Sequence, residues 1–243
     1  MLYLIGLGIW DEKDISMRGL EACRKADEVF AEFYTAKWGG SRKGLEKLIG
    51  KPVRILERKH LEEESGRLIA KAKNRIIAVL VPGDPISATT HLKLLQEARE
   101  SRVPYRVVHS SSILTSVAES GLSLYNFGRV VTMVSPSNMY NPESFYDILA
   151  QNKKAGLHSL ILLDIKMGVR ECVDLLIGKE NEKKQGLLSP ETRLVAISKL
   201  GSEEQRISYD TPLELKNENM SAPAVLIIPG DLQFFEREFL ERL

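Results

Sequence analysis

Three short loops rich in glycine, aspartate or serine each follow an apolar stretch of the chain. They are residues 6–9 (Gly-Leu-Gly-Ile), 81–85 (Val-Pro-Gly-Asp-Pro) and 110–113 (Ser-Ser-Ser-Ile). In an open α/β sheet, ligands bind outside the carboxyl ends of the strands, where the backbone groups of such loops are free to form hydrogen bonds. The loops are therefore candidates for one binding edge. Each also has a structural alternative: a tight turn, a charged helix start or a helix cap.

Asp84 is the side chain with the clearest chemical potential in these loops. Gly83 permits backbone conformations closed to other residues, and Pro85 restricts Asp84 to extended geometry. A carboxylate held in this way can bond a ligand hydroxyl or face a cation. The first loop is not a dinucleotide-binding fingerprint, because Asp11 stands where the third glycine belongs, and it lacks the lysine of a phosphate-binding loop.

Metal and nucleophile chemistry find no support in the sequence. The four histidines show no metal-ligand spacing, and no nucleophile motif is present. His91 falls in a predicted helix, where a structural role is favoured. Cys23 and Cys172 are far apart and unpatterned, which predicts a reducing compartment and no disulfide framework.

The overall composition is that of a globular protein. Of 243 residues, 43% are hydrophobic, and 34 Lys and Arg stand against 33 Asp and Glu, a formal net charge of +1. A charge near zero argues against salt-driven nucleic-acid binding. The apolar N-terminus meets the acidic residues 11–14 with no basic region before it, which predicts a buried strand and no signal peptide. No apolar run reaches the roughly 20 residues of a membrane helix, so a cytoplasmic location is expected.

Short apolar runs alternate with amphipathic stretches, which predicts an α/β fold with mostly parallel sheets. Strands are predicted at residues 2–5, 28–32, 75–81, 103–109, 129–134, 159–165, 193–198 and 224–228, with an edge strand at 205–209. Helices are predicted at residues 16–25, 61–73, 88–100, from the serines at 110–112 through Glu119, and at 144–152, 169–177 and 232–242. Two α/β domains, 1–112 and 113–243, are predicted, with a single domain as the alternative.

The last predicted helix carries an apolar stripe. Leu232, Phe235, Phe239 and Leu240 fall along one helical side. Such a stripe is predicted to pack on its own sheet rather than on a partner.

Several segments occur in a characteristic order. They are residues 3–8 (Tyr-Leu-Ile-Gly-Leu-Gly), 31–35 (Ala-Glu-Phe-Tyr-Thr), 82–85 (Pro-Gly-Asp-Pro) with 88–91 (Ala-Thr-Thr-His), 156–158 (Gly-Leu-His) with 163–166 (Leu-Asp-Ile-Lys), and 228–230 (Ile-Pro-Gly). Through them nearly the whole chain resembles the diphthine synthases, a branch of the tetrapyrrole-methylase-like class of S-adenosylmethionine methyltransferases. Residues 31–35 and 82–91 are specific to this branch, whereas the glycine loops are shared across the wider class.

The resemblance implies two α/β domains with S-adenosylmethionine in a cleft between them, no metal, and a homodimer. It implies methylation of the amine of a 3-amino-3-carboxypropyl group on a histidine of translation elongation factor 2, a step of diphthamide biosynthesis. The residues expected by motif to contact the cofactor are Ile9, Asp84, Ser87, Ser112, Ile113, Leu163, Ser198 and Ala224. The chain departs from the family pattern in a shorter segment after Lys166. It also has Ala224 and Gln233 where histidines are common, so the departures concern the substrate side.

Transfer of an activated methyl group needs an aligned, neutral amine, so some group must accept the proton of the substrate ammonium. By position, Glu32 is the candidate for orienting or deprotonating the amine, with a salt-bridged carboxylate as the alternative. Phe33 and Tyr34 are the candidates for holding a methylated cation through cation–π contacts, followed by Tyr125 and Tyr140. A core position is the alternative for Tyr34.

Two other functions stay open at this point. One is an enzyme of the same class that acts on a tetrapyrrole or on ribosomal RNA. The net charge of +1 speaks against RNA, and residues 32–34 match the protein-substrate branch better. The other is a non-catalytic protein that only binds the cofactor or an adenine nucleotide.

Overall fold

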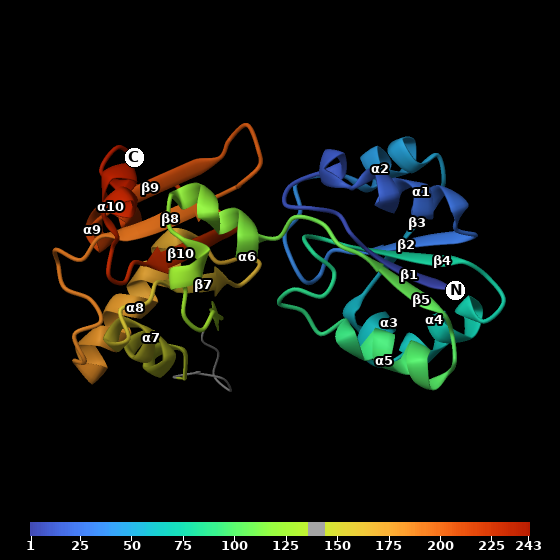
Figure 1. Cartoon of the computed structure of the whole chain (residues 1–243), viewed down its shortest axis with the longest axis horizontal. Coiled ribbons are helices and arrows are strands. Elements are labelled where there is room, and N and C mark those ends of the chain that lie inside the picture. Colours follow the sequence, from blue (N-terminus) through green and yellow to red (C-terminus); the bar gives the residue numbers. More distant parts are fainter. Residues whose placement is uncertain (136–143) are drawn as a thin grey trace. The chain divides into compact units, whose positions relative to one another are not determined.

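The computed structural model describes residues 1–135 and 144–243, and the chain divides into two compact units, Met1–Ser116 and Val117–Leu243 (Figure 1). The division falls shortly after residue 112, where the domain boundary is predicted. Tyr140, one of the predicted pocket aromatics, lies outside the described residues. Across the part of the chain that is described, none of the helices has the length and apolar character of a membrane span.

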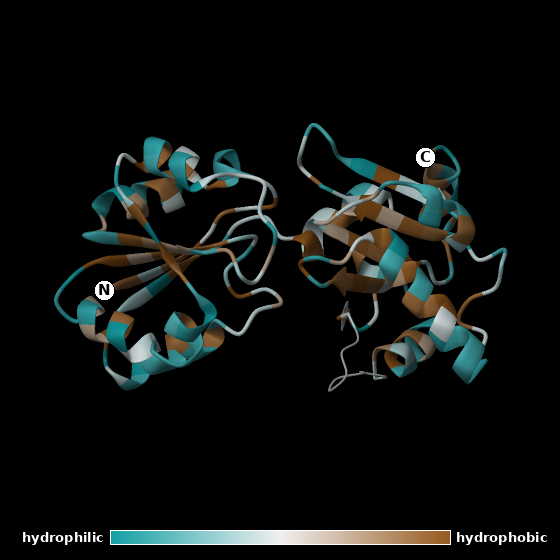
Figure 2. Ribbon diagram, turned by 180° about the vertical axis from the view of Figure 1, so that it is seen from behind, coloured by the Kyte–Doolittle hydropathy of each residue, from teal (hydrophilic) through white to brown (hydrophobic). Residues whose placement is uncertain are grey.

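The N-terminal unit is a parallel sheet covered by helices on both faces. Its strands are β1 (Leu2–Gly6), β2 (Glu28–Glu32), β3 (Val53–Leu56), β4 (Ile77–Val81) and β5 (Tyr105–Val108), in the order β3-β2-β4-β1-β5. Helices α1 (Met17–Lys25) and α2 (Arg42–Ile49) cover one face, and α3 (Arg58–Glu62), α4 (Ser65–Ala72) and α5 (Leu92–Glu100) cover the other (Figure 1). The central strand β4 is buried along its whole length, as a doubly covered strand must be. Figure 2 shows the apolar strands, in brown, between the two helical layers.

The strand order places a topological switch point between β1 and β4. From β1 the chain moves outward to β2 on one side, and from β4 it moves past β1 to β5 on the other side. At such a point neighbouring connections diverge, and the crevice at the carboxyl ends of the strands is open to a ligand. The loops after β1, β2, β4 and β5, which we call the carboxyl edge, contain all three loops singled out in the sequence.

The C-terminal unit holds a mixed sheet. Its strands are β6 (Val131–Met133), β7 (Ser159–Leu163), β8 (Leu194–Ser198), β9 (Arg206–Asp210) and β10 (Ala224–Ile228), in the order β6-β7-β10-β8-β9. Strands β6 and β7 run parallel, whereas β10 is antiparallel to β7 and β8, and β9 is antiparallel to β8. The prediction of mostly parallel sheets is wrong for this unit. The link between β8 and β9 is too short for the crossover that a parallel pair requires.

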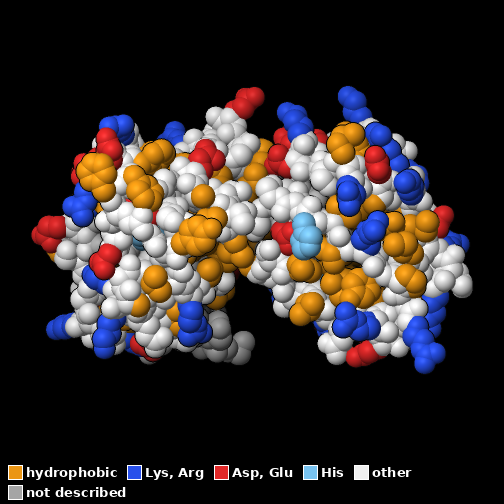
Figure 3. Space-filling view, in the orientation of Figure 1, with side chains coloured by type: hydrophobic (Ala, Val, Ile, Leu, Met, Phe, Trp, Pro, Cys, Tyr) orange, Lys and Arg blue, Asp and Glu red, His pale blue; other side chains and the backbone are white. Residues whose placement is uncertain are grey.

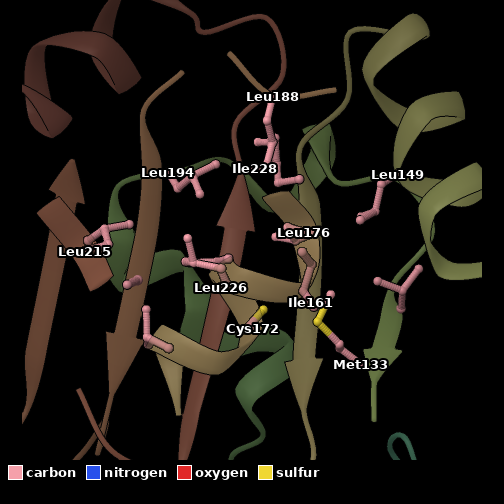
Figure 4. Close-up of a cluster of buried hydrophobic side chains, with 14 of the residues drawn as sticks. Met133, Leu149, Ile161, Cys172, Leu176, Leu188, Leu194, Leu215, Leu226 and Ile228 are labelled. Atoms are coloured by element: carbon pink, nitrogen blue, oxygen red, sulfur yellow. The ribbon is translucent and has the colours of Figure 1, made fainter. Parts of the chain in front are cut away.

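In the described part of the C-terminal unit, the sheet is flanked by helices α7 (Ser144–Lys154), α8 (Val169–Lys183), α9 (Pro212–Asn217) and α10 (Phe234–Leu240). Figure 4 shows the core that the sheet shares with α7, α8 and α9, with Ile161 and Leu226 from the strands facing Cys172 and Leu176 of α8. All four of these side chains are fully buried. The α/β class is therefore confirmed in both units, with separate cores.

Local backbone geometry moves several predicted boundaries. Ala88 has a φ of 53°, a left-handed conformation that an α-helix does not contain, so α5 begins at Leu92 and not at residue 88. The helix predicted over 61–73 is broken into α3 and α4. The helix predicted after the serines is a short α6 (Ile113–Ser116) followed by a 3-10 turn (Val117–Ser120). The sequence-based prediction omits α2, β3 and α9, which are short elements of eight, four and six residues.

Helix α10 exposes much of its predicted apolar stripe. Leu240 is buried, but Phe235 and Phe239 are 56% and 46% exposed. The prediction that this stripe packs on its own sheet is therefore wrong for the phenylalanines. The buried face passes through Glu236 and Leu240, one position around the helix from the predicted side.

Candidate functional site

Hydrogen bonds hold the loops after β1 and β4 together at the switch point. The amide of Gly8 donates to the carbonyl of Gly83 over 3.2 Å, and the amide of Gly83 donates to the carbonyl of Gly8 over 2.8 Å. Gly6 lies against this pair, because a Cβ at Gly6 would stand 2.5 Å from the Gly83 carbonyl oxygen. Gly6 is thus required by the close approach of the Gly83 backbone, and hydrogen bonds join the two loops into one surface.

Gly83 differs from the other glycines of this edge. Its φ of 69° favours glycine, yet a Cβ at this position would meet nothing within 4 Å. Gly8, by contrast, is packed, since its Cβ would overlap the side chain of Asp14. The backbone at Gly83 therefore faces open space at the switch point, where a ligand can approach it closely.

Asp84 holds its own loop to the loop after β5. Its Oδ1 accepts hydrogen bonds from the Ile86 amide (3.1 Å) and the Ser87 hydroxyl (3.0 Å), and its Oδ2 lies 2.7 Å from Nδ1 of His109 and 3.3 Å from the Ser110 amide. Burial alone would raise the pKa of Asp84, but these hydrogen bonds, His109 foremost, hold it below its ordinary value. The carboxylate is ionised near neutral pH and already has partners for both oxygens.

The remaining cofactor candidates of this unit lie along the same edge. Ile9 is half-buried after β1, and Ser87 lies half-buried in the Asp84 loop. Ser112 is buried, and its hydroxyl accepts from the Leu114 amide over 3.3 Å, while Ile113 begins α6. The structure therefore brings Ile9, Asp84, Ser87, Ser112 and Ile113 to one edge of one sheet.

Three further cofactor candidates meet at one edge of the C-terminal sheet. Leu163 ends β7, Ser198 ends β8, and Ala224 begins β10. Ala224 and Ser198 are paired in the β10–β8 ladder, and Val225 pairs with the neighbour of Leu163. The antiparallel course of β10 is what places its first residue beside the last residues of β7 and β8.

Glu32, at the end of β2, is fully buried and bonded to its own loop. Its Oε2 accepts from the amides of Tyr34 (3.0 Å) and Thr35 (3.1 Å), and its Oε1 accepts from the Thr35 hydroxyl. Burial raises the pKa of Glu32, and the hydrogen bonds from Thr35 and Tyr34 oppose the shift without cancelling it. Direct contact with a substrate amine has no support in this geometry, because the side chain has no exposed surface.

His91 lies between the Glu32 loop and the loop after β4. It caps α5 rather than lying inside a helix, it is 3% exposed, and its Nε2 lies 3.6 Å from Oε1 of Glu32. Its Nδ1 contacts the Thr89 hydroxyl. Burial lowers the pKa of His91 to about 4, so the ring is neutral near pH 7. Nε2 of His91 has no hydrogen-bond partner among the described residues, so the ring packs between two loops of the carboxyl edge without bonding them together.

The aromatic candidates next to Glu32 are packed against protein groups. Phe33 stacks on Trp38, with ring centroids 5.1 Å apart. The Tyr34 ring packs against the core, and the guanidinium of Arg58 lies 5.2 Å from its centroid. Arg58 thus already occupies one cation-binding face of Tyr34.

Replacement of Tyr34 by phenylalanine is expected to leave the free energy of unfolding unchanged or to raise it by about 1 kcal/mol. The Tyr34 hydroxyl is buried and has no hydrogen-bond partner among the described residues, so its removal deletes a desolvated polar group. Tyr34→Ala should instead cost about 3 kcal/mol, because it also removes the ring. Urea unfolding of the three proteins checks this, and a loss above 1 kcal/mol in Tyr34→Phe would show that the hydroxyl has a partner.

A buried histidine–carboxylate pair organises the C-terminal unit. His158 and Glu236 are both fully buried, and Nε2 of His158 lies 3.2 Å from Oε1 of Glu236. Nδ1 of His158 accepts from the Gly230 amide over 2.8 Å, so Nε2 carries the proton that Glu236 accepts. The sequence segments 156–158 and 228–230 are thus explained by packing, and a single sequence gives no sign that Glu236 is their partner.

Among the residues that the structure describes, no group of three or more His, Cys, Asp or Glu side chains is arranged to hold a metal ion. Two carboxylates of the carboxyl edge lie beside histidines instead: Asp84 is hydrogen-bonded to His109, and Glu32 lies 3.6 Å from the neutral ring of His91. The first of these pairs is absent from the sequence-based expectations, because Asp84 and His109 meet only when β4 and β5 lie on either side of β1.

Comparison with known proteins gives consistent results over the whole chain. Residues 1–215 match the model of the tetrapyrrole (corrin/porphyrin) methylases. A diphthine synthase of Methanothermobacter thermautotrophicus is 41% identical over 99% of this chain and 94% of its own length, and a diphthine methyl ester synthase of Schizosaccharomyces pombe is 36% identical over 99% and 93%. A solved diphthine synthase superposes with a TM-score of 0.91 at 36% identity, covering 99% of this chain and 94% of the other.

The chain belongs to the tetrapyrrole methylase family, and its fold is that of the solved diphthine synthase. Within the class, its full-length similarity is to the diphthine synthases, so the predicted resemblance is confirmed. The methyltransferase class predicted for this chain is confirmed with it.

Proposed function

We propose that this chain transfers methyl groups from S-adenosylmethionine to the amine of the 3-amino-3-carboxypropyl group on a histidine of translation elongation factor 2. The observation that carries the proposal is the pair of loops after β1 and β4, which are hydrogen-bonded to each other at the switch point and leave Gly83 facing open space. The full-length similarity to diphthine synthases supports the substrate.

The cofactor fits the donors of this edge. A glycine backbone open to approach and an ionised carboxylate suit a ligand with a cationic sulfonium and hydroxyls. Residues proposed to hold it are Ile9, Asp84, Ser87, Ser112 and Ile113 of the N-terminal unit and Leu163, Ser198 and Ala224 of the C-terminal unit. When bound, it supplies a methyl group that needs no further activation.

The protein's contribution is then alignment. Holding an amine in line with the donated methyl group can lower the barrier by about 7–11 kcal/mol. We assign Glu32 to positioning, since its carboxylate fixes the backbone of Tyr34 and Thr35 and reaches the His91 ring. Phe33 and Tyr34 remain candidates for the substrate side of this loop, and the exposed part of Phe33 is better placed for a ligand than the buried hydroxyl of Tyr34.

Transfer of labelled methyl groups to alternative acceptors tests the substrate. The purified chain is incubated with labelled S-adenosylmethionine and with elongation factor 2 bearing the aminocarboxypropyl-histidine, with a tetrapyrrole, or with ribosomal RNA. Label is expected on the elongation factor alone. Label on either other acceptor would favour a related methyltransferase, and binding without any transfer would favour a non-catalytic cofactor-binding protein.

The product has two chemical possibilities within this function. The aminocarboxypropyl group offers an amine and a carboxylate, and one relative is named as a methyl ester synthase. We propose methylation of the amine in every case, with an ester on the carboxylate as an added product that fragmentation of the modified peptide would reveal.

We also propose that the chain forms a homodimer through an apolar patch of the C-terminal unit, made of Leu124, Tyr125, Phe234, Phe235 and Phe239. These side chains are 41–98% exposed. The Ser123 amide donates to Glu236 of α10, and Gly121 packs on the ring of Phe239, so the two parts of the patch are adjacent. Figure 3 shows hydrophobic side chains, in orange, gathered on the surface of this unit.

Sedimentation at micromolar concentration is expected to give a species of about twice the chain mass of 27.3 kDa. Phe235→Lys should shift it to the monomer, because a charge in an apolar contact is desolvated without a partner. Lys184→Glu, on the exposed end of α8, is the matched charge-changing control and should leave the dimer intact. A stable 27.3 kDa species for the unaltered chain would reject the dimer.

The proposed location is a reducing compartment, the cytoplasm. Cys23 and Cys172 are both free and buried. Burial raises the pKa of Cys23 to about 12 and raises that of Cys172 as well, so both remain unreactive thiols.

A further inference from the structure

We propose that His109, oriented by Asp84, accepts the proton of the substrate amine during methyl transfer. His109 follows β5 at the carboxyl edge, and its Nδ1 lies 2.7 Å from Oδ2 of Asp84. Its side chain is 65% exposed, whereas that of Asp84 is 8% exposed. The pair therefore presents an anchored imidazole to the open side of the edge. This inference rests on the proposed function.

The chemistry of the substrate requires such a group. The amine is an ammonium near neutral pH and has no lone pair to donate until it loses a proton. That proton passes to Nε2 of the imidazole. The nitrogen lone pair then forms the bond to the methyl carbon, and the carbon–sulfur bond breaks with its electrons going to sulfur. The imidazolium returns the proton to solvent, so the protein is unchanged after each transfer.

The pairing with Asp84 selects the ring nitrogen that does this. Asp84 accepts four hydrogen bonds and is ionised, so it acts as an acceptor toward His109. Nδ1 of His109 must then carry the proton, which leaves the lone pair on Nε2. A carboxylate that orients an imidazole and stabilises its charged form is the arrangement by which histidine serves as a general base.

Exposure distinguishes His109 from Glu32 and His91, two other titratable groups of the carboxyl edge. Glu32 is fully buried, and His91 is 3% exposed and held between Thr89 and Glu32. Strands β2 and β5 are three strand spacings apart, about 14 Å, so one amine cannot reach both Glu32 and His109. His109 is the one of these groups that a substrate can touch.

Two acidic residues lie beside the loop that carries His109. Asp84 is hydrogen-bonded to His109 itself. Asp14, on the neighbouring loop, presents its backbone oxygen to the Ser110 hydroxyl, and its carboxylate accepts from the Trp10 amide. Asp84→Asn is therefore the direct variant for the first test.

The first test is independent of activity. Nitrogen-15 NMR of the full chain, unaltered and as Asp84→Asn, reports which ring nitrogen of His109 is protonated in the neutral form. The Nδ1–H tautomer is expected in the unaltered chain and should be lost or diminished in Asp84→Asn. A dominant Nε2–H tautomer in the unaltered chain would overturn the assignment.

The second test uses His109→Ala in methyl transfer to the modified elongation factor. We expect kcat to fall about 10²- to 10⁴-fold, with affinity for S-adenosylhomocysteine, measured by calorimetry, within threefold of the unaltered chain. The defect should narrow as the pH rises and the amine deprotonates unaided, and added imidazole should restore part of the rate. His60→Ala, a histidine of α3 outside the edge, is the matched control.

The outcomes separate this inference from the function on which it rests. If the unaltered chain transfers methyl groups and His109→Ala does so within threefold of it, His109 is not the proton acceptor. A constant defect across pH with no response to imidazole would also overturn the assignment. No transfer by the unaltered chain would reject the proposed function and this role together.

Discussion

Replacement of Glu236 by alanine is expected to lower the free energy of unfolding by about 3–5 kcal/mol. The Glu236 carboxylate has no exposed surface and accepts hydrogen bonds from the amides of Ser123 and Gln233, from Asn126 and from His158. Its removal leaves these donors buried without an acceptor and frees α10 from the rest of the C-terminal unit. Denaturant unfolding followed by circular dichroism measures the loss.

Glu238→Ala is the matched control, because Glu238 lies on the same helix in an exposed pair with Arg242 and should change stability by less than about 1 kcal/mol. The acid dependence gives a second readout. Burial raises the pKa of Glu236, but the bonds from Ser123, Gln233 and His158 outweigh burial and lower it. The stabilisation is therefore complete above the unfolded-state pKa and is lost as the pH falls through the lower folded-state pKa. An equal acid sensitivity in Glu236→Ala and the unaltered chain would contradict this role.

Replacement of Gly6 by alanine is expected to weaken cofactor binding at least tenfold, or about 1.4 kcal/mol. It should also lower the free energy of unfolding by about 1–3 kcal/mol, roughly the penalty of overpacking. A Cβ at Gly6 would lie 2.5 Å from the Gly83 carbonyl oxygen, 2.8 Å from Cβ of Ser110 and 3.0 Å from Cδ of Pro85. The added methyl group must therefore push the loops after β1, β4 and β5 apart. Calorimetry with S-adenosylhomocysteine measures the affinity, and fluorescence of Trp10 and Trp38, both in this unit, follows unfolding.

Gly66→Ala is the control for Gly6→Ala. Gly66 lies in α4 of the same unit, and a Cβ there would meet nothing within 4 Å. Alanine favours a helix over glycine by about 1 kcal/mol, so stability should hold or rise while affinity is unchanged. If Gly6→Ala binds S-adenosylhomocysteine as tightly as the unaltered chain, the loops after β1 and β4 do not form the cofactor site.

The sequence predicts the loops of the site better than their partners. Residues 6–9, 81–85 and 110–113 could be found because each follows an apolar run, and parallel strands bring such loops to one edge. The pair of Asp84 and His109 could not be predicted, because it depends on the order of the strands in the sheet, which a single sequence does not reveal. The sequence places Glu32 at the correct strand end, but its full burial depends on tertiary packing that a single sequence does not reveal.

The C-terminal unit was predicted less well. Its strands have the apolar runs of a parallel sheet, and neither the antiparallel course of β10 nor that of β9 leaves a mark on composition. The sequence also does not reveal that Glu236, rather than Phe235, is buried in α10. A shift of one position around α10 depends on the acceptor that His158 and Ser123 require, and not on hydrophobic periodicity.

The identity of the methylated group tests the proposed function most directly. The purified chain is incubated with S-adenosylmethionine and elongation factor 2 bearing the aminocarboxypropyl-histidine, and the modified peptide is fragmented in a mass spectrometer. We expect added methyl groups on the amine nitrogen of that side chain and none on the factor that lacks the aminocarboxypropyl group. An unmodified peptide, or methyl groups on both forms of the factor, would contradict the assignment of this chain as the methyltransferase of that residue.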